Sequence, residues 1–228
     1  MKKLQHIIMI TLILIGLTTP ALAQDQTDDF NVAAKHAIAI ETTTGKVLYE
    51  KDATTPDGVA SMTKILTAYM VYKAVDQGKI NWDTEVGISD YPFNLTVDSE
   101  VSNIPLDSRK YTVKQLLDAT LISSANSAAI ALAEKISGTE SAFVDTMTAQ
   151  LKEWGITDAK LFNASGLNNK YLGDNRYPGS KPDDENTMSA LDVAIIADHL
   201  IKDYPQVLEI TKQTETDFEG DNKLTTHN

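Results

Sequence analysis

A serine and a lysine stand three positions apart at the expected start of a helix, and this pair constrains the fold most. Ser61 and Lys64 lie in the run Ala-Ser-Met-Thr-Lys, after a loop that contains Pro56 and Gly58. Residues at i and i+3 share a face of a helix, so the hydroxyl and the amine can come within hydrogen-bonding reach. We expect the helix to begin at or beside Ser61, where unpaired N–H groups favour developing negative charge, and to end at Gly78.

A second polar cluster, Ser124-Ala125-Asn126, follows further along the chain. Thr112 and Gln115 form a capping-box pattern at the start of an apolar helix that precedes this cluster, and another apolar helix follows it. The cluster is therefore predicted to be a break between two buried helices, which would hold its side chains in place. Serine and asparagine also cap helices well. Two interpretations stay open here, a helix cap and a pair of site residues.

The rest of the chain is predicted to alternate between short strands, loops and helices. The expected elements are a β-hairpin over residues 36–50, an irregular stretch over 81–110, an amphipathic helix over 143–154, a short strand over 160–162, and a helix capped by Ser189 and Asp192. No internal repeat is visible. This order of elements indicates a mixed α/β domain.

The first residues have the pattern of a cleaved signal peptide. Lys2 and Lys3 precede an apolar stretch over residues 7–17, and Ala21-Leu22-Ala23 is a small-x-small cleavage site. The apolar stretch is too short to span a membrane comfortably. We therefore expect residues 1–23 to be a signal peptide and residues 24–228 to form one exported domain.

Composition narrows the possible partners. The chain has no cysteine, so an exported domain of this size must rely on core packing, as a bacterial cell-surface protein can. A net charge of −12 makes nucleic acid and anionic lipid poor partners. The four histidines are scattered without metal-ligand spacing, so no metal and no cofactor are expected.

Taken together, these motifs resemble those of the D-alanyl-D-alanine carboxypeptidases, low-molecular-mass penicillin-binding proteins of serine peptidase family S11. Ser-x-x-Lys and a Ser-x-Asn motif, in this order, are two of the three marks of penicillin-binding enzymes. The resemblance runs from about residue 33 to about residue 208. Its further stretches are residues 116–138, residues 162–167 (Phe-Asn-Ala-Ser-Gly-Leu) and residues 184–190.

The resemblance implies a fold and a reaction. The fold is that of serine β-lactamases and penicillin-binding proteins, a helical cluster packed on an antiparallel sheet. The reaction removes the terminal D-alanine from peptidoglycan stem peptides, with β-lactam antibiotics as covalent inhibitors. Ser61 would be the acylated nucleophile, Lys64 its base and Ser124 a proton relay to the leaving D-alanine. Asn126 would hydrogen-bond the substrate, and the Ser61 N–H would form half of an oxyanion hole.

The base needs an unusual environment in this scheme. A lysine with its ordinary pKa of about 10.4 is protonated at neutral pH. Lowering the pKa to about 7–8 requires burial and a second cation, which the family supplies from a Lys-Thr-Gly strand.

The chain departs from the family pattern at two points. Ala125 stands where the family usually has glycine, a change that a small side chain should allow. No Lys-Thr-Gly occurs in the 228 residues. We therefore expect the chain to stop before that motif, with the C-terminal part of the sheet, and any membrane attachment, in a missing region. We also expect residues 1–228 alone to be inactive.

Two other functions compete with this interpretation. A class A β-lactamase would have a glutamate about 36 residues after its second motif to activate the deacylating water, and that offset falls on Lys160. A catalytically inactive peptidoglycan-binding fragment is the other alternative. We expect the protein to be exported and to act on the outer face of the bacterial cytoplasmic membrane or in the cell wall.

Overall fold

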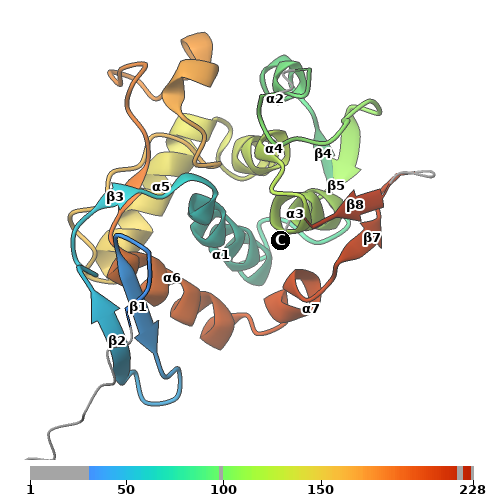
Figure 1. Cartoon of the computed structure of the whole chain (residues 1–228). Helices are drawn as coiled ribbons and strands as arrows, with labels where there is room; N and C mark the ends of the chain where they lie inside the picture. The colour runs from blue at the N-terminus through green and yellow to red at the C-terminus, as the bar shows by residue number, and fades with distance from the viewer. Residues whose placement is uncertain (1–30, 98–99, 220–222, 227–228) are drawn as a thin grey trace, which may run out of the picture. The chain divides into compact units, whose positions relative to one another are not determined.

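The computed structural model describes residues 31–97, 100–219 and 223–226. The chain divides into Met1–Ala33 and a compact unit, Ala34–Asn228. The signal peptide expected over residues 1–23 lies outside the described residues. The fold reported below is that of the second unit (Figure 1).

Helix α1 (Thr63–Asp76) lies at the centre of the unit. It packs against α3 (Val113–Ile122), α4 (Asn126–Ser137), α5 (Glu140–Glu153) and α6 (Ala190–Asp203), and it is surrounded by other elements in Figure 1. Ten of its fourteen residues are buried. The helix is therefore enclosed on nearly every side, whereas a surface helix buries only one apolar stripe. A residue at its first turn is therefore held firmly.

The helices begin and end where local chemistry dictates. The predicted capping box is present at α3, where Thr112 accepts from the Gln115 N–H and the Gln115 side chain accepts from the Thr112 N–H. Ser189 and Asp192 form the equivalent pair at α6. Gly155, with φ +79°, follows the end of α5. These boundaries confirm the sequence-based prediction.

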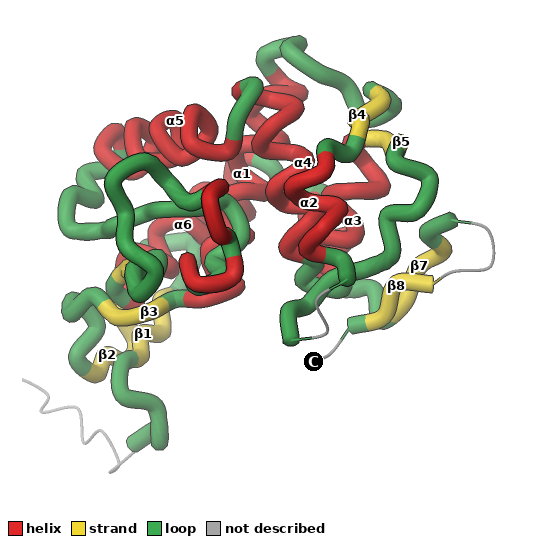
Figure 2. Tube along the Cα trace, turned by 90° about the horizontal axis from the view of Figure 1, so that it is seen from above, coloured by secondary structure: helices red, strands yellow, loops and turns green. Residues whose placement is uncertain are grey.

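Strands in the described residues form four separate two-stranded antiparallel sheets (Figure 2). The predicted hairpin is β1 (Ala37–Ile40) with β2 (Val47–Lys51), and β1 packs on α6. The other pairs are β3 (Asp57–Gly58) with β6 (Thr187–Met188), β4 (Glu85–Gly87) with β5 (Lys110–Thr112), and β7 (Glu215–Asp217) with β8 (Lys223–Thr225). Among the described residues, no further strand lies beside the hairpin.

Two local predictions were wrong. The stretch over residues 81–110 is not simply irregular, because it contains β4, the short helix α2 (Asp90–Leu95) and the start of β5. Pro92 lies in the first turn of α2, where a missing N–H costs no hydrogen bond. Residues 160–162 form only an isolated bridge between Lys160 and Thr187 instead of a strand.

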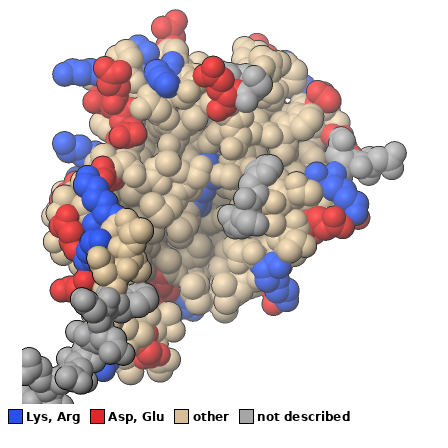
Figure 3. All heavy atoms as spheres, viewed as in Figure 1, with Lys and Arg blue, Asp and Glu red and all other residues tan. Residues whose placement is uncertain are grey.

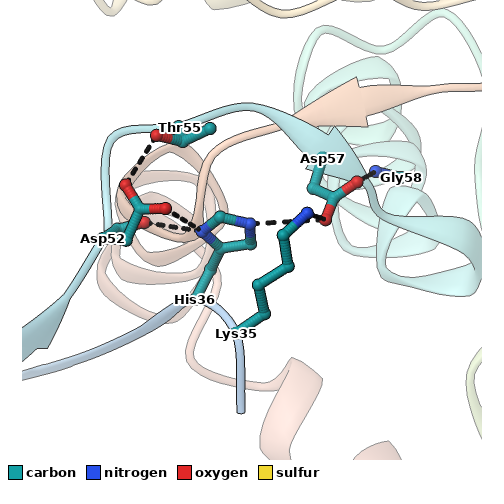
Figure 4. A network of polar contacts seen from close by, with 6 residues as sticks. All are labelled: Lys35, His36, Asp52, Thr55, Asp57 and Gly58. Carbon is teal, nitrogen blue, oxygen red and sulfur yellow. Dashed lines mark hydrogen bonds and ion pairs between the residues drawn. The ribbon is translucent and has the colours of Figure 1, made fainter.

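The segment that leads to Ser61 is tied to the start of β1 through His36 (Figure 4). His36 Nδ1 lies 3.0 Å from Asp52 Oδ2 and Nε2 lies 3.3 Å from Asp57 Oδ2. Lys35 Nζ donates to the same Asp57 oxygen at 2.8 Å. Asp57 is paired with Met188 through β3 and β6, so the chain before Ser61 is anchored on both sides. The last short helix of the unit is α7 (Val207–Thr211).

Candidate active site

Ser61 lies in a single 3₁₀ turn, Ala60–Met62, directly before α1. Its side chain is exposed, whereas Lys64, one turn later in α1, is only 3 % exposed. Lys64 Nζ lies 3.0 Å from Ser61 Oγ. The i, i+3 spacing therefore brings the hydroxyl and the amine together as predicted, with the hydroxyl on the solvent side.

Two further oxygens face the lysine nitrogen. Lys64 Nζ donates to Asn126 Oδ1 at 2.8 Å and to the Ser165 carbonyl oxygen at 2.7 Å. A neutral amine has two N–H donors and one lone pair. When those donors are held by Asn126 and Ser165, the lone pair is directed at Ser61 Oγ. The geometry thus suits a base that accepts the serine proton.

Burial lowers the pKa of Lys64 to about 7. The three oxygens around Nζ belong to a hydroxyl, an amide and a backbone carbonyl, so no carboxylate there offsets the desolvation. Burial is the cause of this lowering, and the second cation expected from the sequence stays a prediction. A pKa of about 7 leaves a substantial fraction of the amine neutral at neutral pH.

Asn126 does not cap α4, contrary to one of the two sequence-based interpretations. The N-cap residue of α4 is Ala125, whose side chain makes no capping hydrogen bond, and the Ser127 N–H in the first turn donates to Asn103 Oδ1 instead. Asn126 is buried and bridges two elements, because its Oδ1 accepts from Lys64 and its Nδ2 donates to the Ser102 carbonyl at 2.9 Å. Ala125 has φ −64°, so the position does not require glycine.

Ser124 occupies the turn between α3 and α4 with φ +53°, a left-handed conformation that is uncommon for a non-glycine residue. It lines a cavity of about 360 Å³ together with Ser61 and Lys64. Thr211, Gln213 and Thr226 line the same cavity from the C-terminal segment. The structure therefore brings all four predicted site residues together, three in this cavity and Asn126 through Lys64.

Charged side chains are sparse around the hollow that Figure 3 shows near the middle of one face of the unit. Most of the visible acidic and basic atoms lie toward the edge, and a small area of basic atoms is visible within the hollow. The pKa of Lys64 is lowered by burial and not by a charged neighbour.

A buried loop over residues 163–166 supplies the carbonyl that Lys64 contacts. The Asn163 side chain accepts from the N–H groups of Ser165 and Gly166, at 3.1 and 2.7 Å. Gly166 has φ +79°, and a Cβ built there would lie 1.7 Å from the Ala60 carbonyl oxygen. The loop therefore packs directly on the turn that carries Ser61.

From the sequence, this loop stands out only as part of the segment 162–167 that resembles the family, and no role follows for it. The Ser165 contact uses a backbone carbonyl, which any residue type provides, so no side-chain pattern could have revealed it. Asn186 also supports the loop, since its Nδ2 donates to the Asn163 carbonyl at 2.9 Å and to Thr63 Oγ1 at 3.1 Å.

Comparison with known proteins identifies the family of the chain. A family model described as D-alanyl-D-alanine carboxypeptidase, peptidase S11, matches residues 21–228. The chain belongs to peptidase family S11. It is 33% identical over 214 residues to the D-alanyl-D-alanine carboxypeptidase DacF of Bacillus subtilis, covering 92% of this chain and 50% of that protein. The DacA carboxypeptidase of Escherichia coli is 27% identical over 222 residues, covering 92% and 52%.

Solved structures that are similar to this S11 chain include those of penicillin-binding proteins. A peptidoglycan synthesis regulatory factor (PBP3) from Streptococcus pneumoniae is 62% identical with a TM-score of 0.86, covering 87% of this chain and 55% of the other. Penicillin-binding protein D2 from Listeria monocytogenes, in its ampicillin-bound form, is 25% identical with a TM-score of 0.70, covering 87% and 73%. The penicillin-binding-protein fold is thus confirmed. The S11 chain spans about half the length of the curated relatives it matches.

The described residues contain neither a candidate membrane span nor a candidate metal site. None of the helices there is long and apolar enough to cross a membrane. No group of three or more His, Cys, Asp or Glu side chains in that part of the S11 chain could hold a metal ion.

Proposed function

We propose that this chain is the catalytic part of a serine-type D-alanyl-D-alanine carboxypeptidase, which removes the terminal D-alanine from peptidoglycan stem peptides. The observation that carries the proposal is the 3.0 Å contact between Lys64 Nζ and Ser61 Oγ, with the pKa of Lys64 lowered to about 7 by burial. A hydroxyl becomes a competent nucleophile only with an adjacent base. Membership of family S11 supports the same reaction.

In the proposed acylation step, Ser61 Oγ attacks the carbonyl carbon of the penultimate D-alanine and its proton passes to Lys64 Nζ. The bond to the terminal D-alanine then breaks, and Ser124 relays a proton to the departing amine. Water hydrolyses the resulting Ser61 ester and regenerates the hydroxyl. The Ser61 N–H, at the entrance to α1, is proposed as one oxyanion donor.

Asn126 has two proposed tasks. Its amide makes one bond to Lys64 and one to the Ser102 carbonyl. Each end of the amide has capacity for one more hydrogen bond, since the oxygen has two lone pairs and the nitrogen two hydrogens. Contact with the substrate peptide is therefore compatible with orientation of Lys64.

Several wider features are proposed with the activity. The substrate class is a stem peptide ending in D-Ala-D-Ala, and β-lactams are proposed as covalent inhibitors because one similar protein, penicillin-binding protein D2 from Listeria monocytogenes, has been solved with ampicillin and with cefotaxime bound. We propose that the protein is exported and acts on the cell wall. Attachment to the membrane through a C-terminal region stays a prediction. The comparisons favour neither the β-lactamase nor the inactive-fragment alternative.

Residues 24–228 are proposed to be the part of the catalytic domain that precedes a Lys-Thr-Gly motif. In this family that motif would hold the substrate carboxylate and supply the second oxyanion donor. Loss of one oxyanion donor alone costs about 10²–10³ in rate. Release of D-alanine should therefore be far slower from residues 24–228 than from a protein that also contains the motif. Comparable turnover by the two would contradict this boundary.

The acylation site is tested by mass spectrometry of the full-length protein after penicillin treatment. We expect one adduct, on the peptide that contains Ser61, and none after Ser61→Ala. Ser123→Ala is the control, because Ser123 Oγ donates to the Thr225 carbonyl instead of facing Lys64. An adduct on Ser124 would overturn the assignment.

A further inference from the structure

A buried carboxylate lies behind the loop that contacts Lys64. Glu140 is the first residue of α5 and is 6 % exposed. Its Oε1 accepts from the Ala164 N–H at 2.8 Å and its Oε2 accepts from the Tyr91 hydroxyl at 2.8 Å. Burial raises the pKa of Glu140 to about 7, and nearby Glu134 on α4 contributes. Burying a carboxylate is costly, so this one calls for a physical explanation.

The peptide groups around Ala164 are held from two directions. Its N–H donates to Glu140, and its carbonyl oxygen accepts from Thr67 Oγ1 at 2.6 Å. The next residue, Ser165, presents the carbonyl that accepts from Lys64 Nζ at 2.7 Å. Two hydrogen bonds therefore connect Glu140 on α5 to Lys64 on α1. One is made by the N–H of Ala164 and the other by the carbonyl oxygen of the next residue, Ser165.

We propose that Glu140 is a positioning residue for the reaction, because its hydrogen bond to Ala164 holds the Ser165 carbonyl where it directs the Lys64 amine toward Ser61. The proposal rests on the proposed function of the Ser61–Lys64 pair. Glu140 does not line the cavity that contains Ser61, Lys64 and Ser124, and so acts through the loop alone.

Three substitutions separate this role from general stability. Glu140→Gln keeps an oxygen for the Ala164 N–H and can donate its amide to Tyr91, so it should rescue function. Glu140→Asp keeps the charge, but its side chain is one methylene shorter and cannot reach Ala164 without movement. Gln150→Leu is the matched control. Gln150 is another buried polar side chain of α5, and its partner is Lys73, away from the loop.

Two measurements on these variants distinguish positioning from folding. The first resolves β-lactam acylation of the full-length protein into the dissociation constant of the initial complex and the acylation rate constant. A small misplacement of a reacting group can cost about 10²-fold, so we expect Glu140→Asp to slow acylation by about 10–100-fold while the dissociation constant changes by less than about 3-fold. Glu140→Gln and Gln150→Leu should stay within about 3-fold of the wild-type rate.

The second measurement needs no activity. The pKa of Lys64 is followed by NMR of the full-length protein with lysine labelled at Cε. A loosened loop admits water to the buried amine, so Glu140→Asp should raise the pKa of Lys64 from about 7 toward the ordinary 10.5. Gln150→Leu should leave the pKa of Lys64 unchanged.

The possible outcomes are distinct. A wild-type protein that penicillin does not acylate would overturn the proposed function, and the NMR titration alone would then decide whether Glu140 positions Lys64. Normal acylation by wild type and by Glu140→Asp, with an unchanged Lys64 pKa, would overturn the positioning role. Equal losses in Glu140→Asp and Gln150→Leu would also overturn it, because the effect would then be one of stability.

Discussion

Lys64 Nζ lies 3.0 Å from Ser61 Oγ, yet the two residues differ sharply in exposure: the serine is open to solvent and the lysine is 3 % exposed. One helical turn separates them, so the same local geometry places the hydroxyl where a substrate can reach it and the lysine where it is almost fully enclosed by protein. This difference is what makes the pair chemically useful. A substantial fraction of the lysine amine is neutral at neutral pH because it is buried, while the serine hydroxyl stays accessible.

The first prediction concerns the base itself. Lys64→Ala should slow acylation of the full-length protein by penicillin by about 10²–10⁴, the usual size of general-base assistance. Lys73→Ala is the control, since Lys73 lies further along the same helix and binds Gln150 and Glu153. The rates are measured by stopped-flow with a fluorescent penicillin. A near wild-type rate for Lys64→Ala would remove this residue from the role.

Asn126→Asp should change the pH at which the site works. It places a carboxylate where the amide oxygen now lies 2.8 Å from Lys64 Nζ, which favours the ammonium form and raises the pKa of Lys64 above about 7. The acylation rate, which requires the neutral amine, should then reach its plateau at higher pH than in wild type.

The control for this variant is Asn103→Asp. It adds the same charge near the start of α4, where the Asn103 oxygen accepts from Ser127, but it does not contact Lys64. Its pH–rate profile should match that of wild type. If Asn126→Asp also leaves the profile in place, the amide of Asn126 does not govern the protonation of Lys64.

Two glycines with the same backbone conformation should respond differently to alanine. Gly166 and Gly155 both have φ +79°, but a Cβ at Gly166 would lie 1.7 Å from the Ala60 carbonyl oxygen, whereas a Cβ at Gly155 meets nothing within 4 Å. Gly155→Ala should cost about 1–2 kcal/mol, the penalty of the left-handed conformation alone. Gly166→Ala should cost more than about 3 kcal/mol, because backbone must also move. Urea unfolding measures both, and equal costs would contradict the close approach.

The pH dependence of stability should carry opposite contributions from Lys64 and Glu140. The pKa of Lys64 is lowered from 10.5 to about 7, so between these values the unfolded chain binds a proton that the folded chain does not, and stability rises with pH. The pKa of Glu140 is raised from 4.5 to about 7, so between these values the folded chain holds the extra proton and stability falls as pH rises.

Variants isolate each contribution. Compared with wild type, Lys64→Met should remove the rise above pH 7, and Glu140→Gln should remove the fall below it. Urea unfolding of residues 24–228 at a series of pH values gives the free energy of unfolding for each protein. A Lys64→Met protein whose stability increases above pH 7 as steeply as wild type would show that the lysine is not buried as described.

The sequence alone determined the features that depend on near neighbours. The contact between Ser61 and Lys64 follows from an i, i+3 spacing at a helix start, and the capping box of Thr112 and Gln115 was readable as a local pattern. The end of α5 at Gly155 is of the same kind. In each case a few consecutive residues supply both the backbone geometry and the hydrogen-bond partners, so no distant part of the chain was needed.

Only the tertiary structure decided what surrounds the lysine. Asn126 lies 62 positions from Lys64 and Ser165 lies 101 positions away, and the contact to Ser165 uses a backbone carbonyl that carries no sequence signal. The burial of Glu140 is also not visible in the sequence, because a glutamate at the start of a helix is typical of a surface position. The low pKa of Lys64 also comes from packing, because desolvation depends on how many atoms from other elements enclose a group. A local pattern could therefore indicate the proposed nucleophile and base, but the enclosure that lowers the pKa of the lysine arises only when distant segments pack together.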